Sequence, residues 1–258
     1  MQESMIVLSV DCLVSQDGNV DENYYKNLAW IAKYIQAANT GKYPNICLCS
    51  QGSAIFVGAI GLLIGWPHLS AIVENGAAFF DPLKNELRIH PEVPFKTQNA
   101  LRGITRRIAL LILKKYPVLF LSPGQEASVT FVRRNINSSL SIENMRKGIK
   151  KFIAKFIKKK ILKTVISRNS ISIMPAGINK GKAVELLTKE RGLDLKQCIG
   201  IGSLKSDISF LEKTGLIGCP QNADDECKKF VKGKKGYISQ HNYAEGIADV
   251  IKWFLQIE

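Results

Sequence analysis

Short runs of apolar, β-forming residues alternate with helical segments in the first third of the chain, and this alternation limits the possible folds more than any other feature. The run Met5–Val10 precedes a helical pattern over Tyr24–Ala38, and the run Ile46–Cys49 precedes another over about Ser53–Leu63. A third run follows at Ala71–Val73. Continuous apolar runs are typical of strands that are buried on both faces, as in parallel sheets. The order therefore predicts an α/β fold with a parallel sheet and right-handed crossovers.

The pattern changes in the middle third of the chain. Helices predicted over Asn99–Lys115 and Ser141–Ile157 alternate there with strands such as Ala127–Arg133, whose apolar residues recur at every second position. This period is expected of an antiparallel sheet with one face toward water. The alternation of the first third then resumes. We therefore predict a core domain and an inserted α+β domain, which comprise residues 1–82 with 175–258, and residues 83–174.

The charge balance favours anionic partners. The 258 residues include 36 Lys and Arg against 22 Asp and Glu, which gives a net charge of +14. A charge of this sign suits phosphorylated metabolites, nucleic acid, an acidic protein or a membrane surface, and does not choose among them. The longest apolar run, Ala54–Trp66, is too short to span a bilayer, and no secretory signal is visible at the start. We expect a soluble, cytoplasmic protein with no transmembrane segment.

The six cysteines are scattered along the chain and have no His-rich partner segment among three histidines. Cys47 and Cys49 are two positions apart, which is not the spacing of a zinc knuckle. We interpret the cysteines as buried thiols.

One acid, Asp11, ends the first apolar run and is followed by a polar turn, Ser15–Gly18. Open α/β sheets place their chemistry at the carboxyl ends of parallel strands. An acid at such a position can be a nucleophile, a metal ligand, or both. Taken alone, it is more often a helix cap or a turn former.

Further motifs follow Asp11 in a characteristic order. They are Ser50 after the second strand, Glu74–Ala77, Asn179–Ala183 and Gly202–Asp207. In this order the chain resembles the haloacid dehalogenase (HAD) superfamily, in the branch with a large α+β cap, which includes Cof-type, sucrose-phosphate and archaeal phosphoglycolate phosphatases. The resemblance covers nearly the whole chain. It implies a HAD-like parallel-sheet core with an inserted cap, and magnesium-dependent hydrolysis through an aspartyl-phosphate.

The resemblance also assigns roles to single residues. It implies that Asp11 is the nucleophile, that Ser50 binds the phosphoryl oxygens, and that Lys180 offsets the phosphate charge. We prefer Lys180 to its neighbour Lys182 because of its place in the motif. Asp207 is the second acid of the final motif and, with Asp11, a candidate ligand of Mg²⁺. Gln51, in the same turn as Ser50, is a further candidate for phosphate binding.

Two positions depart from the family pattern. The first motif would place a proton-donating Asp where this chain has Leu13, and the final motif would begin with an Asp where it has Ser203. Loss of a general acid costs about 10²–10⁴ in rate. A serine hydroxyl is also a poor replacement for a carboxylate toward Mg²⁺. Asp17 is the remaining acid of the first loop, and the shortened loop gives no reason to expect it to act as the donor.

These departures favour a phosphatase-type scaffold with reduced or lost catalysis, a pseudoenzyme kept to bind an anionic ligand or a protein partner. The alternative is an active magnesium-dependent phosphomonoesterase that acts on a sugar phosphate or phosphoglycolate through Asp11. The cofactor is Mg²⁺ in the active case and none otherwise.

The segment Ser141–Arg168 holds ten basic residues and one acid, Glu143. Its apolar residues recur at helical spacing, so the simplest interpretation is a cap helix with solvated lysines. A weaker alternative is a polyanion-binding module, with this segment as a docking face for an acidic protein, anionic lipid or nucleic acid without sequence preference. The basic partner face would consist of Arg146, Lys147, Lys150, Lys151, Lys155 and Lys158.

Overall fold

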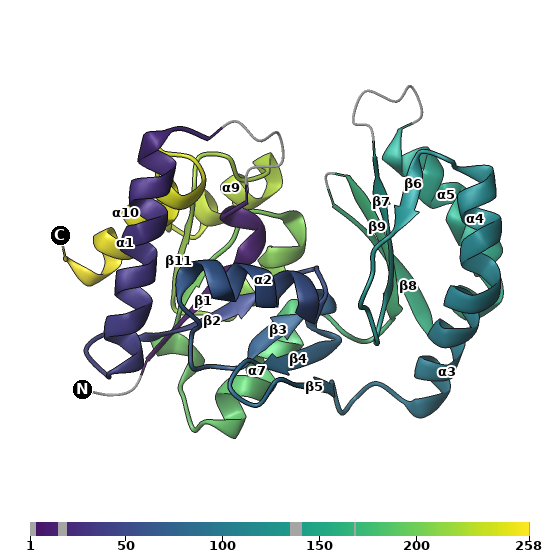
Figure 1. Cartoon of the computed structure of the whole chain (residues 1–258), viewed down its shortest axis with the longest axis horizontal. Coiled ribbons are helices and arrows are strands. Elements are labelled where there is room, and N and C mark those ends of the chain that lie inside the picture. The colour runs from purple at the N-terminus through teal and green to yellow at the C-terminus, as the bar shows by residue number, and fades with distance from the viewer. Residues whose placement is uncertain (1–3, 15–19, 135–140, 168, 258) are drawn as a thin grey trace. The chain divides into compact units, whose positions relative to one another are not determined.

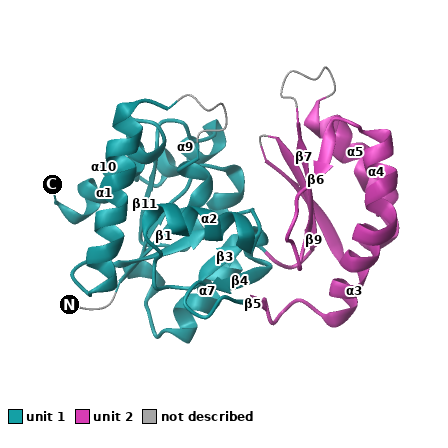
Figure 2. Cartoon of the chain, viewed as in Figure 1, with its two compact units in different colours: residues 1–87, 179–258 teal, residues 88–178 magenta. Residues whose placement is uncertain are grey.

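A computed structural model describes residues 4–14, 20–134, 141–167 and 169–257. The chain forms two compact units, shown in Figure 2. The core unit comprises Met1–Leu87 and Asn179–Glu258, and the inserted unit comprises Arg88–Ile178. The limits expected from the sequence lie a few residues earlier in the chain at both crossings.

The core unit is built on an eight-stranded sheet with the order β12-β11-β10-β1-β2-β3-β4-β5 (Figure 1). Its strands are β1 (Met5–Ser9), β2 (Asn45–Cys49), β3 (Ala71–Val73), β4 (Ala78–Asp81), β5 (Glu86–Ile89), β10 (Ile199–Ile201), β11 (Leu216–Cys219) and β12 (Tyr237–Ile238). The pairs from β12 through β3 are parallel, as predicted from the apolar runs. The pair β3–β4 is antiparallel, because the turn Glu74–Gly76 reverses the chain between them.

Capping side chains fix the starts of three core helices. The helices of this unit are α1 (Glu22–Asn39), α2 (Ala54–Ile64), α7 (Lys180–Glu190), α8 (Ile208–Leu211), α9 (Asp225–Gly233) and α10 (Tyr243–Leu255). Asp21, Ser53 and Asn179 each accept a hydrogen bond from a backbone N–H in the first turn of α1, α2 and α7. Such caps satisfy N–H groups that have no partner within the helix, and they place the start of α7 beside the strand ends.

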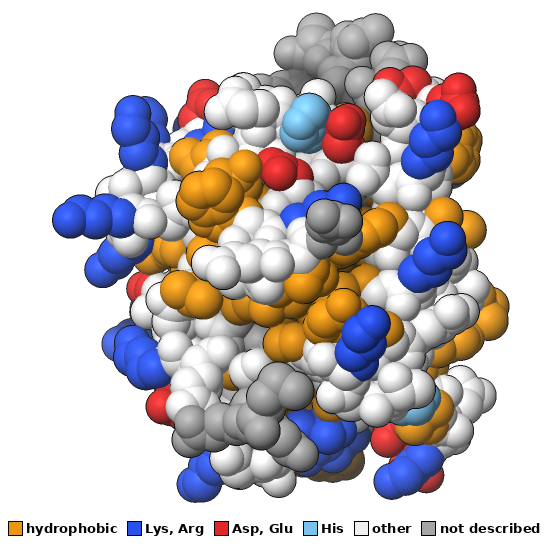
Figure 3. Space-filling model, turned by 90° about the vertical axis from the view of Figure 1, so that its left-hand side faces the viewer, with side chains coloured by type: hydrophobic (Ala, Val, Ile, Leu, Met, Phe, Trp, Pro, Cys, Tyr) orange, Lys and Arg blue, Asp and Glu red, His pale blue; other side chains and the backbone are white. Residues whose placement is uncertain are grey.

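Helices α1 and α10 lie side by side on the core unit (Figure 1). Figure 3 shows this face: hydrophobic side chains gather near its centre, and Lys and Arg lie mainly around its margin. Tyr25 and Trp253 are exposed on these two helices. Throughout the described part of the chain, no helix is both long and apolar enough to cross a membrane. All six cysteines are buried free thiols, as predicted.

The inserted unit is the α+β domain that the sequence predicted. Its antiparallel sheet has the order β6-β7-β9-β8, with β6 (Leu119–Leu121), β7 (Val129–Arg133), β8 (Leu162–Ile166) and β9 (Ser170–Pro175). Its helices are α3 (Phe95–Gly103), α4 (Ala109–Lys115), α5 (Ile142–Phe152) and α6 (Ala154–Lys158), and a π-helical turn (Ile104–Ile108) joins α3 to α4.

The inserted unit differs from the sequence prediction in three places. The first helix begins at Phe95, because Pro94 has a fixed φ and leads directly into it. Strand β6 was not predicted. The helix predicted over Ser141–Ile157 is broken at Ile153, which has a non-helical conformation.

Candidate active site

Three strands of the core sheet end at the same edge, and each is followed by a polar residue of interest. Asp11 lies in a 3₁₀ turn (Val10–Cys12) directly after β1, and Ser50 follows β2. Asp207 ends a second 3₁₀ turn (Lys205–Asp207) after β10. Because these strands pair in parallel, their carboxyl ends meet, as expected for a ligand site in an open α/β sheet.

Lys180 joins the two acids. It is the first residue of α7, and its Nζ lies 2.6 Å from Oδ1 of Asp207 and 3.3 Å from Oδ2 of Asp11. The Lys180 side chain is fully buried, whereas Lys182 is only partly buried and contributes its backbone N–H to the Asn179 cap. The structure therefore brings Lys180, and not Lys182, to both carboxylates.

Both carboxylate oxygens of Asp207 accept hydrogen bonds. Its Oδ2 accepts hydrogen bonds from the backbone N–H groups of Ser203 at 2.8 Å and Leu204 at 2.9 Å, and its Oδ1 accepts from Lys180. The side chain has no exposed surface. Asp207 thus anchors the lysine and the turn after β10, and its oxygens are already engaged.

Asp11 is less completely paired. Burial raises the pKa of its carboxyl, the Lys180 ammonium opposes this, and the charge of Asp207 adds to the rise. Burial also lowers the pKa of Lys180, but the carboxylates of Asp207 and Asp11 raise that pKa by more, so the lysine stays charged. With Asp11 ionised, two carboxylates share one ammonium, and the buried group keeps one uncompensated negative charge.

The turn after β2 presents donors to this group. Ser50 is fully buried, and its Oγ accepts a hydrogen bond from the Gly52 N–H at 2.9 Å, so its own O–H remains available to donate. The backbone N–H of Gln51 donates toward the Asp11 carboxylate. Gln51 therefore takes part through its main chain, which its side-chain type did not indicate.

The two positions that depart from the family pattern are both buried. Leu13 is 1% exposed and its carbonyl accepts a hydrogen bond from the Tyr24 hydroxyl at 3.0 Å. Ser203 is also 1% exposed, and its hydroxyl lies beside the Cys12 thiol. The polar turn Ser15–Gly18, with Asp17, lies outside the described residues.

The motif Glu74–Ala77, to which the sequence assigned no role, contacts the site. Asn75, in the 3₁₀ turn Glu74–Gly76, donates its backbone N–H to the Ser50 carbonyl at 3.1 Å. Gly76 lies against the Asn179–Lys180 peptide. The sequence signal was the Asn-Gly pair, which is typical of a left-handed turn and does not by itself indicate a ligand.

The six residues of the basic partner face belong to the inserted unit, on α5 and α6. Arg146 is paired with Glu143 at 2.5 Å, and Lys155 lies over the Phe156 ring. The apolar residues of the same helices pack on the inserted sheet, as the simplest interpretation predicted. None of these six residues belongs to the core unit that holds Asp11, Ser50 and Lys180.

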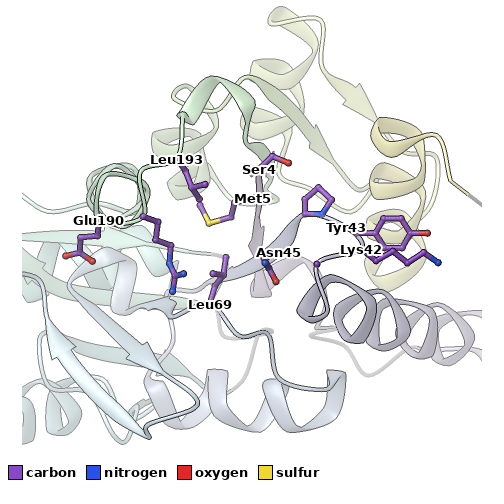
Figure 4. Close-up of a pocket in the computed structure, with 11 residues that line it drawn as sticks. Ser4, Met5, Lys42, Tyr43, Asn45, Leu69, Glu190 and Leu193 are labelled. Atoms are coloured by element: carbon purple, nitrogen blue, oxygen red, sulfur yellow. The ribbon is translucent and has the colours of Figure 1, made fainter. Parts of the chain in front are cut away.

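A hollow of about 850 Å³ lies elsewhere on the core unit (Figure 4). Its lining includes Met5 and Asn45, the first residues of β1 and β2, so it lies at the amino ends of these strands. Asp11 and Ser50 follow the opposite ends of the same strands. The hollow is therefore separate from the acidic group.

Comparisons with known proteins agree with this fold. A family model described as haloacid dehalogenase-like hydrolase matches residues 123–251. A phosphoglycolate phosphatase of Methanobrevibacter smithii is 21% identical over 256 residues, which cover 96% of this chain and 100% of that protein. A putative phosphatase of Streptococcus pyogenes is 35% identical over 86 residues, which cover 33% of this chain and 30% of that protein.

Solved structures share the fold over the whole chain. A Thermoplasma acidophilum protein has a TM-score of 0.69 at 19% identity, and the match covers 100% of both chains. The sucrose-phosphatase of Synechocystis sp. PCC6803, solved in complex with sucrose and phosphate, has a TM-score of 0.65 at 16% identity and 98% coverage of both chains.

Proposed function

Because the chain belongs to the haloacid dehalogenase-like hydrolase family, we propose that it is a phosphomonoesterase that transfers the phosphoryl group of a small phosphate ester to Asp11. The observation that carries this proposal is the buried Lys180 ammonium between the carboxylates of Asp11 and Asp207, at the ends of parallel strands. The name of the Methanobrevibacter smithii relative supports phosphoglycolate as one substrate to test.

The residues present supply most of the chemistry. The Ser50 hydroxyl and the remaining N–H of Lys180 donate to the phosphoryl oxygens. An Asp11 carboxylate oxygen attacks phosphorus, and the bond between phosphorus and the ester oxygen breaks. The leaving oxygen takes its proton from water, because Leu13 has none to give. A second water then attacks phosphorus, which releases inorganic phosphate and restores the Asp11 carboxylate.

The family implies Mg²⁺, and the residues present offer such an ion negative charge but few oxygen ligands. The buried group carries one uncompensated negative charge, and the Ser203 hydroxyl is a buried oxygen without a hydrogen-bond partner among the described residues. Those residues also contain no cluster of three acidic, His or Cys side chains around a possible ion. Mg²⁺ commonly uses one or two carboxylates together with substrate phosphate.

Asp11 would hold the ion, with Ser203 as a neutral neighbour, while Asp207 is occupied by its own partners. When bound, Mg²⁺ would offset the negative charge of the phosphoryl group. We infer that ion and phosphate bind together, since the protein alone offers few oxygen ligands.

A second candidate function is binding of a phosphate ester without turnover. Leu13 and Ser203 favour it, because the chain lacks a general acid and a metal-binding carboxylate at these positions. Both candidates share the phosphoryl site and differ only in the chemical step. The basic partner face remains a separate proposal for an acidic partner or a polyanion.

The deciding experiment is turnover of p-nitrophenyl phosphate, phosphoglycolate and sugar phosphates, with and without Mg²⁺, beside an Asp11→Asn variant. We expect magnesium-dependent turnover that the variant lowers at least a hundredfold, in line with a lost catalytic group worth about 10²–10⁴ in rate. Phosphate binding without turnover above the variant's level would establish the second candidate. If the chain shows no turnover and binds no phosphate, both candidate functions are wrong.

A further inference from the structure

The turn Glu74–Gly76 connects the two sides of the phosphoryl site. On one side, the backbone N–H of Glu74 donates to the Gly52 carbonyl at 2.9 Å, and that of Asn75 donates to the Ser50 carbonyl at 3.1 Å. On the other side, Gly76 lies so close to the Asn179 carbonyl that a Cβ added to this glycine would clash with the carbonyl oxygen. Asn75 is therefore held between the Ser50 turn and the peptide that begins α7.

The backbone of this turn is strained. Glu74, Asn75 and Gly76 have φ values of 53°, 58° and 92°, so three consecutive residues adopt the left-handed region. Glycine adopts this region freely and asparagine tolerates it, whereas a glutamate adopts it only at an energetic cost. Strained segments of this kind persist where surrounding contacts fix them, and they are frequent at ligand-binding sites.

The Asn75 side chain carries a buried amide. The residue is 3% exposed, and neither its Oδ1 nor its Nδ2 has a hydrogen-bond partner among the residues that the structure describes. A buried amide left unpaired destabilises the folded state and is rare in native proteins. A ligand that enters the site would supply the missing partner.

The hydrogen-bond donors identified so far serve two of the three oxygens of a bound phosphoryl group. Lys180 has three N–H donors, of which two are directed to Asp207 and Asp11. The Gln51 N–H is directed to Asp11 as well. A phosphoryl group has three oxygens to satisfy, and the Ser50 hydroxyl and the last Lys180 N–H serve two of them.

We propose that Asn75 is a phosphate-binding residue, whose Nδ2–H donates a hydrogen bond to the remaining phosphoryl oxygen of the bound ester. This inference rests on the proposed function and adds a ligand-contacting residue to it. It also accounts for a strained turn whose buried amide has no hydrogen-bond partner among the described residues.

The test is the affinity for inorganic phosphate in the presence of MgCl₂, measured by isothermal titration calorimetry on the natural chain and on Asn75→Gly and Asn75→Asp variants. Glycine and aspartate both accept the left-handed backbone, so neither change should disturb the turn. We expect about tenfold weaker binding for Asn75→Gly, equivalent to ~1.4 kcal/mol. Asn75→Asp should weaken binding further, because its carboxylate cannot donate and repels phosphate.

Asn45→Ala is the matched control, because Asn45 Oδ1 also has no hydrogen-bond partner among the described residues, but Asn45 lies at the amino end of β2. It should bind phosphate as the natural chain does. Without phosphate, Asn75→Gly should melt at or above the natural temperature, because an unpaired amide has been removed.

Natural affinity in Asn75→Gly would overturn the role of Asn75 and leave the proposed function intact. If the natural chain binds no phosphate and hydrolyses no ester, the proposed function fails and this role fails with it.

Discussion

The ammonium nitrogen of Lys180 lies 2.6 Å from Oδ1 of Asp207, and neither side chain has any exposed surface. A buried ion pair of this kind contributes little net stability, since both charges have lost their hydration. Removal of one partner is different, because the other charge is left buried and alone. The pair therefore makes Lys180 important to folding, apart from its proposed role in phosphate binding.

We expect Lys180→Met to lower the free energy of unfolding by about 3–5 kcal/mol, because it leaves two buried carboxylates uncompensated. Urea denaturation at neutral pH measures the loss. A second change, Asp207→Asn, should restore part of it. Lys189→Met, at an exposed position on the same helix, is the control and should change stability by no more than about 0.5 kcal/mol. Equal effects of the two lysine changes would contradict the prediction.

Because Leu13 cannot donate a proton, we expect the rate of hydrolysis to depend on the leaving group of the ester. p-Nitrophenolate leaves without a proton, whereas an alkoxide such as that of glycolate needs one. The natural chain should therefore hydrolyse p-nitrophenyl phosphate much faster than phosphoglycolate, and Leu13→Asp should raise turnover of phosphoglycolate by about 10²-fold. Leu13→Asn has a similar shape and no acidic proton, so it controls for packing. Similar turnover of both esters by the natural chain would show that another group protonates the leaving oxygen.

Because Ser203 replaces a carboxylate ligand, we expect the chain to bind Mg²⁺ weakly in the absence of phosphate. A thermal-shift series should show no rise in melting temperature with Mg²⁺ alone and a rise when phosphate is added with it, since a ligand that binds only the folded chain stabilises it more as its concentration exceeds its Kd. Ser203→Asp supplies a further carboxylate and should give a rise with Mg²⁺ alone. That gain should disappear in the double variant with Asp11→Asn. A rise with Mg²⁺ alone in the natural chain would indicate a complete metal site.

The buried thiols predict a loss of stability in alkali. Burial raises the pKa of Cys47 from 9.0 to about 12, and burial also raises the pKa values of Cys12 and Cys49. The unfolded thiol ionises near pH 9 while the folded one stays protonated, so the contribution of Cys47 is complete below pH 9. It is lost as the pH rises from 9 to about 12.

Urea midpoints at pH 8.5, 9.5 and 10.5 measure this loss. The slope due to one such thiol is about 1.4 kcal/mol per pH unit above its unfolded pKa. Cys47→Ala should have a lower stability at pH 8.5 but a shallower decline. Parallel declines in the two proteins would rule out a contribution from Cys47.

The basic partner face predicts salt-sensitive retention on a polyanion. The natural chain should bind a heparin column at low salt, and a variant with four exposed lysines of α5 and α6 changed to Glu should elute at much lower salt. The changed residues are Lys147, Lys151, Lys155 and Lys158. The control changes four exposed lysines of the core unit to Glu, at Lys189, Lys196, Lys232 and Lys235. Equal elution of both variants would assign retention to net charge alone.

Much of the fold could be predicted from the sequence because the core strands are buried on both faces. Strand β3 (Ala71–Val73) has the bounds that its apolar run predicts. The break at Ile153 could not be predicted, because the apolar period continues through it and Ile153 itself is buried.

In the site, too, some residues could be predicted from the sequence and others could not. The end of the first apolar run indicated Asp11, since open α/β sheets place their chemistry at the carboxyl ends of parallel strands, and the resemblance to the HAD superfamily indicated Ser50 and Asp207. The interest of Asn75 depends on its burial and its unpaired amide, which no spacing reveals. The main-chain role of Gln51 was equally hidden, because a backbone N–H has no sequence signature.

Asp11 and Lys180 are 169 residues apart in the chain, and this separation has a consequence for biosynthesis. The ribosome completes β1, β2 and the whole inserted unit before it adds the lysine that neutralises the first acid. A nascent chain that ends before residue 180 therefore carries an acid at the end of β1 with no counter-charge, and it also lacks β10, the neighbour of β1 in the sheet. The core unit closes late, and until then its first strand remains open to proteases and to chaperones.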